Sequence, residues 1–459
     1  MKKIFLIISI LQIAALLFIS GLSCDEIKDN TLIKTLSLKD AVNIAFASNK
    51  DIQIQEQEIV YARANIMAAQ GLFLPTVSVD ASYTYTGTAL QLASAATPGS
   101  RKDIGVFNGY QSDHRLSFSA NEVVFNGGAN IVNMKQARLG LKIQQETLRS
   151  RKCDVEFEVK RLYYGLLLAY ETERIAEDLL NQAQEHYEDV KRKFNEGTSS
   201  RFDVLQSKVQ VSKVMPELVK AKNNIEIIKA EFKKLLSIDM KNEITLKDNS
   251  LAYSYIDVRE SEFLIKAYAG NPQMILRLMG IDMNRWSIEY AKSGYYPQVN
   301  ANFNYFYRYY DPAKMFQYKH SNWSVGGTVS VPIFDAFSTT SKVNEAKAKY
   351  EQARLAKDDV RDQVAVDIKR ACLDMNESRT IIDYEKDSIE EAREALKIAN
   401  IGYDNGVKTN LEVLDSQVSL SQVEKSLMEG IYDYLMARAF LDKTMGTDFY
   451  KEESYGNKT

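Results

Sequence analysis

The feature that most constrains this chain is a short stretch that occurs twice, at residues 194–207 and again at 403–416. Each copy carries a glycine, Gly197 or Gly406, that can adopt the left-handed conformation in which many helices end. Each then has a hydroxyl residue followed three positions later by an acid, which is the pattern of a capping box at a helix start. The sequence therefore predicts two sharp helical tips, and at each tip the chain reverses its direction.

The two copies belong to a much longer repeat. From Phe125 onward the second copy follows the first by 209 positions, whereas Pro297 follows Pro75 by 222. The first copy therefore holds 13 extra residues between Pro75 and Phe125. A repeat of this length indicates tandem duplication of a whole structural unit. We expect units at 36–240 and 257–447, joined by a linker at 241–256 and followed by a tail at 448–459.

A change from helical to alternating periodicity marks a β-hairpin in each unit. After Pro75, apolar residues at alternate positions are separated by hydroxyl and acidic ones, which is typical of a strand with one apolar face. A second alternating run leads to Phe125, and the same order follows Pro297. We therefore expect hairpins at 76–125 and 298–334.

Long helices account for most of the remaining sequence. Nothing interrupts a helical pattern over 128–194 or 338–403, and the whole chain contains only 7 Pro and 21 Gly. A shorter returning helix is expected after each tip, and the first unit opens with a helix over 37–70. Apolar and small residues recur along the long helices at spacings of four and three, which predicts a coiled-coil seam. In the first unit the seam consists of Val155, Val159, Leu162, Leu166, Ala169, Ala176, Leu180, Ala183, Tyr187, Val190 and Phe194.

Charge and cysteine usage narrow the class of protein. The 58 basic residues are interleaved with 61 acidic ones, which gives a net charge of -3. The sequence therefore does not predict the basic surface that binding of nucleic acid requires. Residues 1–23 combine two lysines, an apolar run and small residues, which predicts a signal peptide. Cys24 ends a stretch that resembles a bacterial lipoprotein box, so either acylation of Cys24 or ordinary cleavage nearby is expected. Cys153 and Cys372 occupy non-equivalent repeat positions, which argues against a disulfide framework.

Any membrane span of the exported chain must involve its strands. No segment after the leader reaches the roughly 18 apolar residues that a transmembrane helix requires. Four strands are too few to close a membrane barrel, which needs about eight, and open sheet edges are not tolerated in lipid. The strands therefore either close by association of several copies or form a soluble sheet packed on another surface.

Over about residues 36–447 the order of these elements resembles the TolC family of outer-membrane efflux proteins. The motifs that carry this resemblance are Leu-Phe-Leu-Pro75, Phe125-Asn-Gly-Gly and the two tip stretches. The resemblance implies a mixed, mainly α-helical fold with a transmembrane β portion, assembled as a homotrimer. Three copies would share one 12-strand barrel in outer-membrane lipid and a long coiled-coil tunnel in the periplasm. A periplasmic adaptor (membrane fusion) protein would connect the tips to an inner-membrane pump.

The resemblance also implies roles for residues at the tips. Glu412 and Asp415 would form the pore constriction, where three copies bring together carboxylates that favour cations. The alternative is that Glu412 only caps its helix and that Asp415 is a solvated surface residue. Asp203, Tyr403 and Lys408 would form a lock of the closed state, with Lys408 where the family has arginine, so the lock loses a planar donor fork.

Contact with the adaptor is expected at the points farthest from the membrane. The resemblance places this contact at both turns, and the turns are also the most exposed positions that the sequence predicts. The residues concerned are Gly197, Thr198, Ser199, Gly406, Val407 and Lys408.

Nothing in the sequence indicates an enzyme or a cofactor. The three histidines are His114 and His320 beside strands and His186 in a coiled coil, and no metal or nucleophile motif is present. The resemblance thus implies the passive exit duct of a tripartite efflux or type I secretion system, opened by an iris-like movement of the tips. The alternative is a trimeric coiled-coil surface or structural protein without channel activity. Chain reversals at Gly197 and Gly406 count against that alternative.

Overall fold

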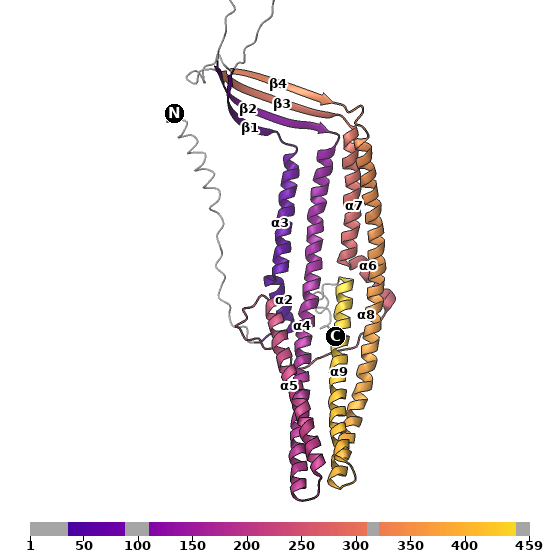
Figure 1. Cartoon of the computed structure of the whole chain (residues 1–459). Helices are drawn as coiled ribbons and strands as arrows, with labels where there is room; N and C mark the ends of the chain where they lie inside the picture. The colour runs from indigo at the N-terminus through magenta and orange to yellow at the C-terminus, as the bar shows by residue number, and fades with distance from the viewer. Residues whose placement is uncertain (1–34, 88–109, 310–320, 447–459) are drawn as a thin grey trace, which may run out of the picture.

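The computed structural model describes residues 35–87, 110–309 and 321–446, which form a long helical body with one β-sheet at its end (Figure 1). The expected signal peptide, Cys24, His320 and the tail at 448–459 lie outside the described residues. The first unit contains α2 (Leu38–Ser48), α3 (Lys50–Gly71), β1 (Thr76–Gly87), β2 (Tyr110–Asn126), α4 (Ala129–Asn195) and α5 (Arg201–Leu235). The second contains α6 (Glu260–Gly270), α7 (Pro272–Lys292), the 3-10 turn η1 (Ser293–Tyr295), β3 (Gln298–Tyr309), β4 (Ser321–Ser330), α8 (Ser338–Asp404) and α9 (Asn410–Met445).

The opening helix of each unit is broken, contrary to the single helix expected over 37–70. Asn49 separates α2 from α3 with an extended backbone, and its side-chain oxygen accepts hydrogen bonds from two amides in the first turn of α3. Asn271 separates α6 from α7 in the same way, and Pro272 begins α7. The apolar pattern did not reveal these breaks, because only one extended residue, the asparagine cap, separates the two helices. The spacing of apolar residues is therefore almost unchanged across the break.

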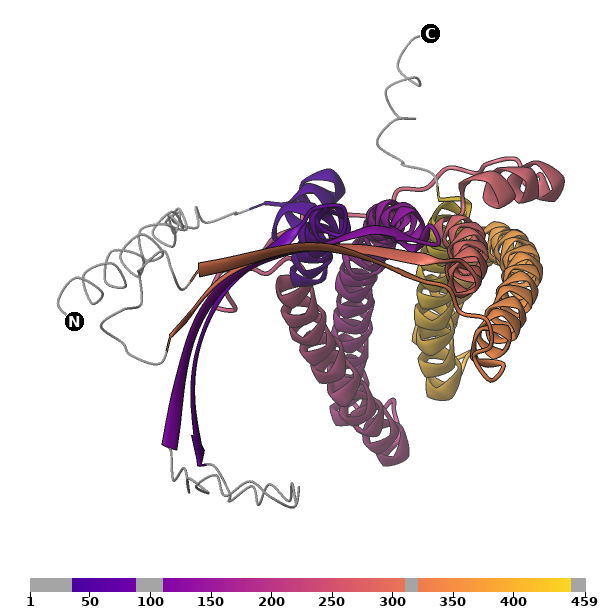
Figure 2. The ribbon, with the colours of Figure 1, turned by 90° about the horizontal axis from the view of Figure 1, so that it is seen from above.

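The four strands form one antiparallel sheet in the order β1, β2, β3, β4. Thr76 lies opposite Asn121 in the first hairpin, and Gln298 lies opposite Ser330 in the second. These are equivalent positions of the repeat, so both hairpins have the same register. The difference in length therefore begins after the last pair that both hairpins share, Tyr85 with Ser112 and Tyr307 with Ser321. Seen from above, the sheet curves away from the row of helices (Figure 2).

The long helices pack in antiparallel pairs, α4 with α5 and α8 with α9, and α4 also contacts α7 and α9 of the second unit. The predicted seam is confirmed for most of its members, although Phe194 in the last turn before the tip is 41% exposed. Burying one aliphatic side chain stabilises a fold by about 1.5–3 kcal/mol. Among the described residues, no helix is both long and apolar enough to cross a membrane. Wholly buried members of the two seams are Val159, Leu166, Ala183, Val190, Ile368, Ala371 and Ile382.

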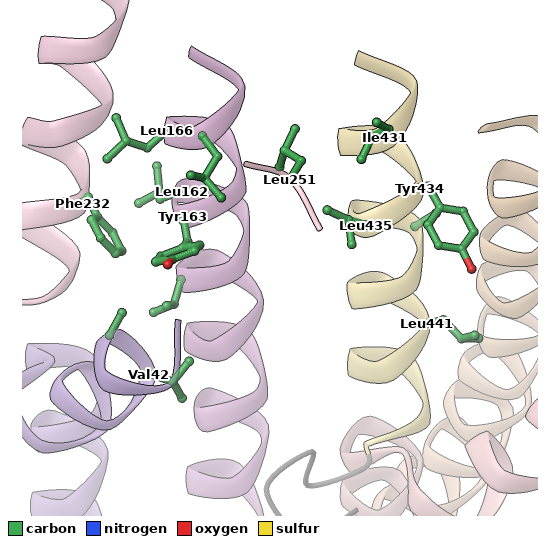
Figure 3. Packing of buried hydrophobic residues seen from close by; sticks show 14 of the residues in the cluster. Val42, Leu162, Tyr163, Leu166, Phe232, Leu251, Ile431, Tyr434, Leu435 and Leu441 are labelled. Carbon is green, nitrogen blue, oxygen red and sulfur yellow. The ribbon is translucent and has the colours of Figure 1, made fainter. Parts of the chain in front are cut away.

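The segment between the units is packed into the helical body. Leu36 forms a parallel β-bridge with Leu246. Farther along, the Tyr434 hydroxyl donates to the main-chain oxygen of Ser254 at 3.2 Å. Figure 3 shows Leu251 between α4 and α9, close to Leu435. This segment therefore helps to hold the two units together midway along the helices.

The passage from sheet to long helix uses left-handed backbone in both units. Gly127 and Gly128 have φ angles of 67° and 84°, and their counterparts Ala336 and Phe337 have 53° and 67°. A side chain on Gly127 would overlap the main-chain oxygen of Ser293, whereas one on Gly128 would meet nothing within 4 Å. Left-handed backbone costs a non-glycine residue about 1–2 kcal/mol. The second unit therefore tolerates strain that the first unit avoids.

Comparing Gly127→Ala with Gly128→Ala separates steric overlap from backbone strain. We expect Gly128→Ala to lower the free energy of unfolding by about 1 kcal/mol, the cost of left-handed alanine. Gly127→Ala should cost about 3 kcal/mol or more, because the junction must also shift away from Ser293. Thermal unfolding followed by circular dichroism measures both, and equal losses would contradict the close contact.

Candidate functional site at the helical tips

Both tips contain the turns and caps that the sequence predicts. Gly197 and Gly406 follow the long helices with φ angles of 81° and 70°. Ser200 and Thr409 then cap the returning helices, and both capping boxes are complete. Each tip is thus a short turn whose amides are satisfied locally.

The residues expected to contact an adaptor lie in these turns. Ser199 is half-buried and the other members of the set are exposed. Val407 is 79% exposed, so its apolar side chain is accessible to a partner. The exposed members are Gly197, Thr198, Gly406, Val407 and Lys408.

Both carboxylate oxygens of Glu412 are engaged. Its Oε1 accepts a hydrogen bond from Lys408 Nζ at 2.6 Å, and its Oε2 accepts one from the Thr409 amide at 2.8 Å. The Lys408 contact, followed by the Thr409 amide and hydroxyl, lowers the pKa of Glu412 to about 2. Because this pKa lies below the ordinary 4.5, the contacts stabilise the tip above pH 4.5 and are lost as the pH falls towards 2.

Asp415 lies one turn farther along α9 and is exposed. Within the described chain, no hydrogen bond or ion pair engages its carboxylate. It lines an open groove of about 390 Å³ between α5 and α9. The apolar side chains of this groove are Phe202, Leu205, Val209, Leu411, Leu414 and Val418.

The three residues expected to form a lock are not joined within one chain. Asp203 accepts hydrogen bonds from its own cap, Ser200. Lys408 is paired with Glu412, and the ring of Tyr403 lies under Lys193 Nζ, 4.3 Å from its centroid. In the described part of the chain, no hydrogen bond or ion pair connects these three side chains to one another.

The structure instead joins the two helical hairpins, α4 with α5 and α8 with α9, through residues for which the sequence predicted no such role. Lys193 Nζ forms an ion pair with Asp404 at 2.7 Å. Deeper inside, His186 Nε2 lies 2.7 Å from Asn410 Oδ1, and the hydroxyl of Ser207 donates to the same oxygen. The sequence does not mark Asn410, because its counterpart in the first unit, Arg201, is another polar residue. These contacts can hold or release the hairpins, but the described residues contain no cluster suited to a metal.

A family model for outer membrane efflux proteins matches residues 41–237 and 265–447. These two matches cover both units, including both tips. The chain belongs to the outer membrane efflux protein family. It is therefore a protein of the outer membrane with a large periplasmic portion.

Relatives of known name resemble the chain along most of its length. The outer membrane protein TolC of Escherichia coli is 21% identical over 443 residues, covering 91% of this chain and 84% of that protein. TolC of Vibrio cholerae is 24% identical over 300 residues, covering 63% and 67%. The alkaline protease secretion protein AprF of Pseudomonas aeruginosa is 20% identical over 408 residues, covering 88% and 83%.

Solved structures share the fold. A crystal structure of CusC superimposes with a TM-score of 0.79 at 16% identity, covering 92% of this chain and 95% of that one. The CmeC outer membrane channel of Campylobacter jejuni gives 0.78 at 18% identity, covering 95% and 94%. At this identity the likeness establishes the arrangement of helices and strands.

Because the tips are repeats, each provides a control for the other. We expect Thr409→Ala to weaken the start of α9 by about 1 kcal/mol, the usual value of an N-cap. Deuterium exchange of amides in residues 407–414 should then rise about fivefold, with little change at 198–205. Ser200→Ala should give the reverse pattern. Exchange that rises equally at both tips in either variant would show that the caps do not act locally.

Proposed function

We propose that three copies of this chain form the exit duct of a tripartite efflux or type I secretion system. Substrates pass through it passively from an inner-membrane pump, and a periplasmic adaptor joins the pump to the tips. Relatives named for efflux pumps and for protease secretion support both kinds of system. The observation that carries the proposal is the pairing of a strand of the first unit with a strand of the second. The same pairing can be repeated between neighbouring chains.

Inside the chain, β2 of the first unit pairs with β3 of the second. Because the units are repeats, β4 is the counterpart of β2, and β1 is the counterpart of β3. The edges of the described sheet are β1 and β4, and their pairing between neighbouring copies would repeat the internal pairing. Three sheets of four strands give twelve strands, which suffice for a closed membrane barrel.

The helices support the same assembly. Ile175 of α4 is 4% exposed, whereas its counterpart on α8, Tyr384, is 72% exposed. Phe157 of α4 packs on Phe440 of α9, whereas its counterpart Val366 is 59% exposed. A neighbouring copy on α8 would cover these apolar side chains as α7 and α9 cover α4.

One face of the sheet suits contact with outer-membrane lipid. Its apolar side chains alternate with serine, threonine and asparagine on the other face, as in barrels with a lipid-facing exterior and an aqueous lumen. The most exposed members of the apolar face are Val77, Val79, Tyr83, Tyr85, Trp323, Val325 and Val329.

At the opposite end, Glu412 and Asp415 of three copies would surround the pore and favour cations. An iris-like movement of the tips would widen this constriction. Before opening, the closed state would be held by contacts between neighbouring copies that involve Asp203, Tyr403 and Lys408. Since Lys408 already pairs with Glu412, a contact between copies would have to share or replace that ion pair.

The adaptor would dock on the exposed turns that end at Ser199 and Lys408. Most residues of these turns are exposed, which supports this, because a partner can reach them from outside the helical body. A trimeric structural protein that conducts nothing is the competing function, and no enzymatic activity is part of either proposal.

Conductance of single channels in a planar bilayer tests the duct. We expect a small conductance that prefers cations, and we expect Glu412→Gln with Asp415→Asn to abolish the preference. The control neutralises Glu185 and Glu188, two exposed acids with the same spacing on α4, and should leave the preference intact. If both variants lose the cation preference equally, Glu412 and Asp415 are not its specific source. A folded trimer without conductance would favour the structural protein.

Engineered disulfides test the pairing of β4 with β1 of the next copy. Ser119 lies opposite Asn304 in the internal pairing, and their counterparts are Thr328 and Ser82. Ser82→Cys with Thr328→Cys should therefore give reducible dimers and trimers on a denaturing gel. Ser119→Cys with Asn304→Cys should instead link within one chain.

An out-of-register pair completes that experiment. Ser78 lies four positions from Ser82 on the same strand, about 13 Å away. Ser78→Cys with Thr328→Cys should therefore link poorly, and native cysteines stay in every variant as a common background. Strong linkage of this pair, or none at Ser82 in a trimer confirmed by sedimentation, would contradict the repeated register.

A further inference from the structure

A small polar cluster is buried near the tips, where the helical hairpin of α4 and α5 meets that of α8 and α9. His186 comes from α4, Ser207 from α5 and Asn410 from the start of α9. They are 9%, 0% and 3% exposed. Polar side chains are seldom buried so deeply without partners, and here they are partners of one another.

The hydrogen bonds fix the proton on His186. The Asn410 amide nitrogen donates to Gln206 Oε1 at 3.0 Å and to the main-chain oxygen of Asp203 at 3.4 Å. The Asn410 oxygen therefore faces His186 and accepts from Ser207 at 3.1 Å and from His186 Nε2 at 2.7 Å. Since an oxygen can only accept, Nε2 carries a hydrogen, and a neutral ring satisfies the contact.

The cluster lies beside the two acids that would line the constriction of the proposed duct. Asn410 is the first residue of α9, and Glu412 and Asp415 follow within the next two turns. His186 and Ser207 belong to the other hairpin. The position of the two acids relative to the first hairpin therefore depends on this contact.

Charging the ring leaves the Nε2–H donor to Asn410 in place but adds a positive charge at a buried position. The charged or titratable groups near it are Asp189 and Lys193 on its own helix and Tyr403 and Asp404 on α8. From α5 and α9 it faces the neutral groups of the cluster. Burial, the largest influence, lowers the pKa of His186 below the ordinary 6.5, although Asn410 and the carboxylates act in the opposite direction. Water solvates the charged ring fully only when the hairpins separate.

We propose that His186 is a positioning residue that holds α9 against the first hairpin while it is neutral, and that its protonation favours separation of the two tips. The proposal rests on the proposed function only in assigning this separation to opening of a duct. The contact itself is a property of one chain.

The sign of the pH dependence follows from the buried neutral ring. Closure is fully supported above pH 6.5 and loses support as the pH falls below that value. Each unit by which the pKa differs between closed and open forms changes their ratio tenfold. The closed fraction should therefore fall between pH 7.5 and pH 5.

Two measurements on the full-length protein test the proposal. Deuterium exchange of residues 197–207 and 406–416, corrected for intrinsic pH dependence, reports separation of the tips in detergent. Bilayer conductance over pH 5 to 8 reports opening. Wild type should show both increasing severalfold as the pH falls below 6.5.

Three variants distinguish positioning from simple packing. His186→Gln keeps a neutral N–H donor for Asn410, so both profiles should become flat at the wild-type level of pH 8. His186→Leu and Asn410→Leu lose the contact and should show raised exchange at every pH. A wild-type pH profile in His186→Gln would overturn the proposal.

The two readouts also separate this proposal from the proposed function. A channel whose pH response survives His186→Gln leaves the duct intact and removes the role of His186. A protein that never conducts but whose tip exchange responds to pH through His186 keeps the positioning role and removes the duct.

Discussion

The burial of one stripe of small and branched side chains along α4, and of another along α8, is the interaction on which the rest of the structure depends. Each helix has 67 residues and is about 100 Å long. Their exposed faces are highly charged, so packing against the shorter helices, mainly α3, α5, α7 and α9, is what keeps them in place. The sheet and the tips are thereby held at opposite ends of a rigid body.

At the second tip, one side chain takes part in two contacts. Glu412 caps α9 through one carboxylate oxygen and binds Lys408 through the other. Much of its charge is therefore balanced within the chain, whereas Asp415 presents its carboxylate to the groove. Of the two acids, Asp415 is the stronger source of field in any pore that they line.

The sequence was most informative where structure depends on local pattern. The tips, the caps and the buried stripes follow from glycine, hydroxyl and apolar residues at fixed spacings. The break at Asn49 was missed because local periodicity continues across it. The contact of Lys408 with Glu412 could have been inferred from their spacing of four. The contact of His186 with Asn410 could not, because it joins residues 224 positions apart and depends on which faces of two helical pairs meet.

The two β-hairpins have the same register although the first unit is longer, which shows where the length of such a chain can vary. The described strands β1 and β2 end at Gly87 and Tyr110, at the end of the sheet away from the helices. A difference in length beyond these ends leaves the strand pairs and helical contacts of the described residues in place. The length of the connection at that end can thus change independently of the helical body and of the paired strands.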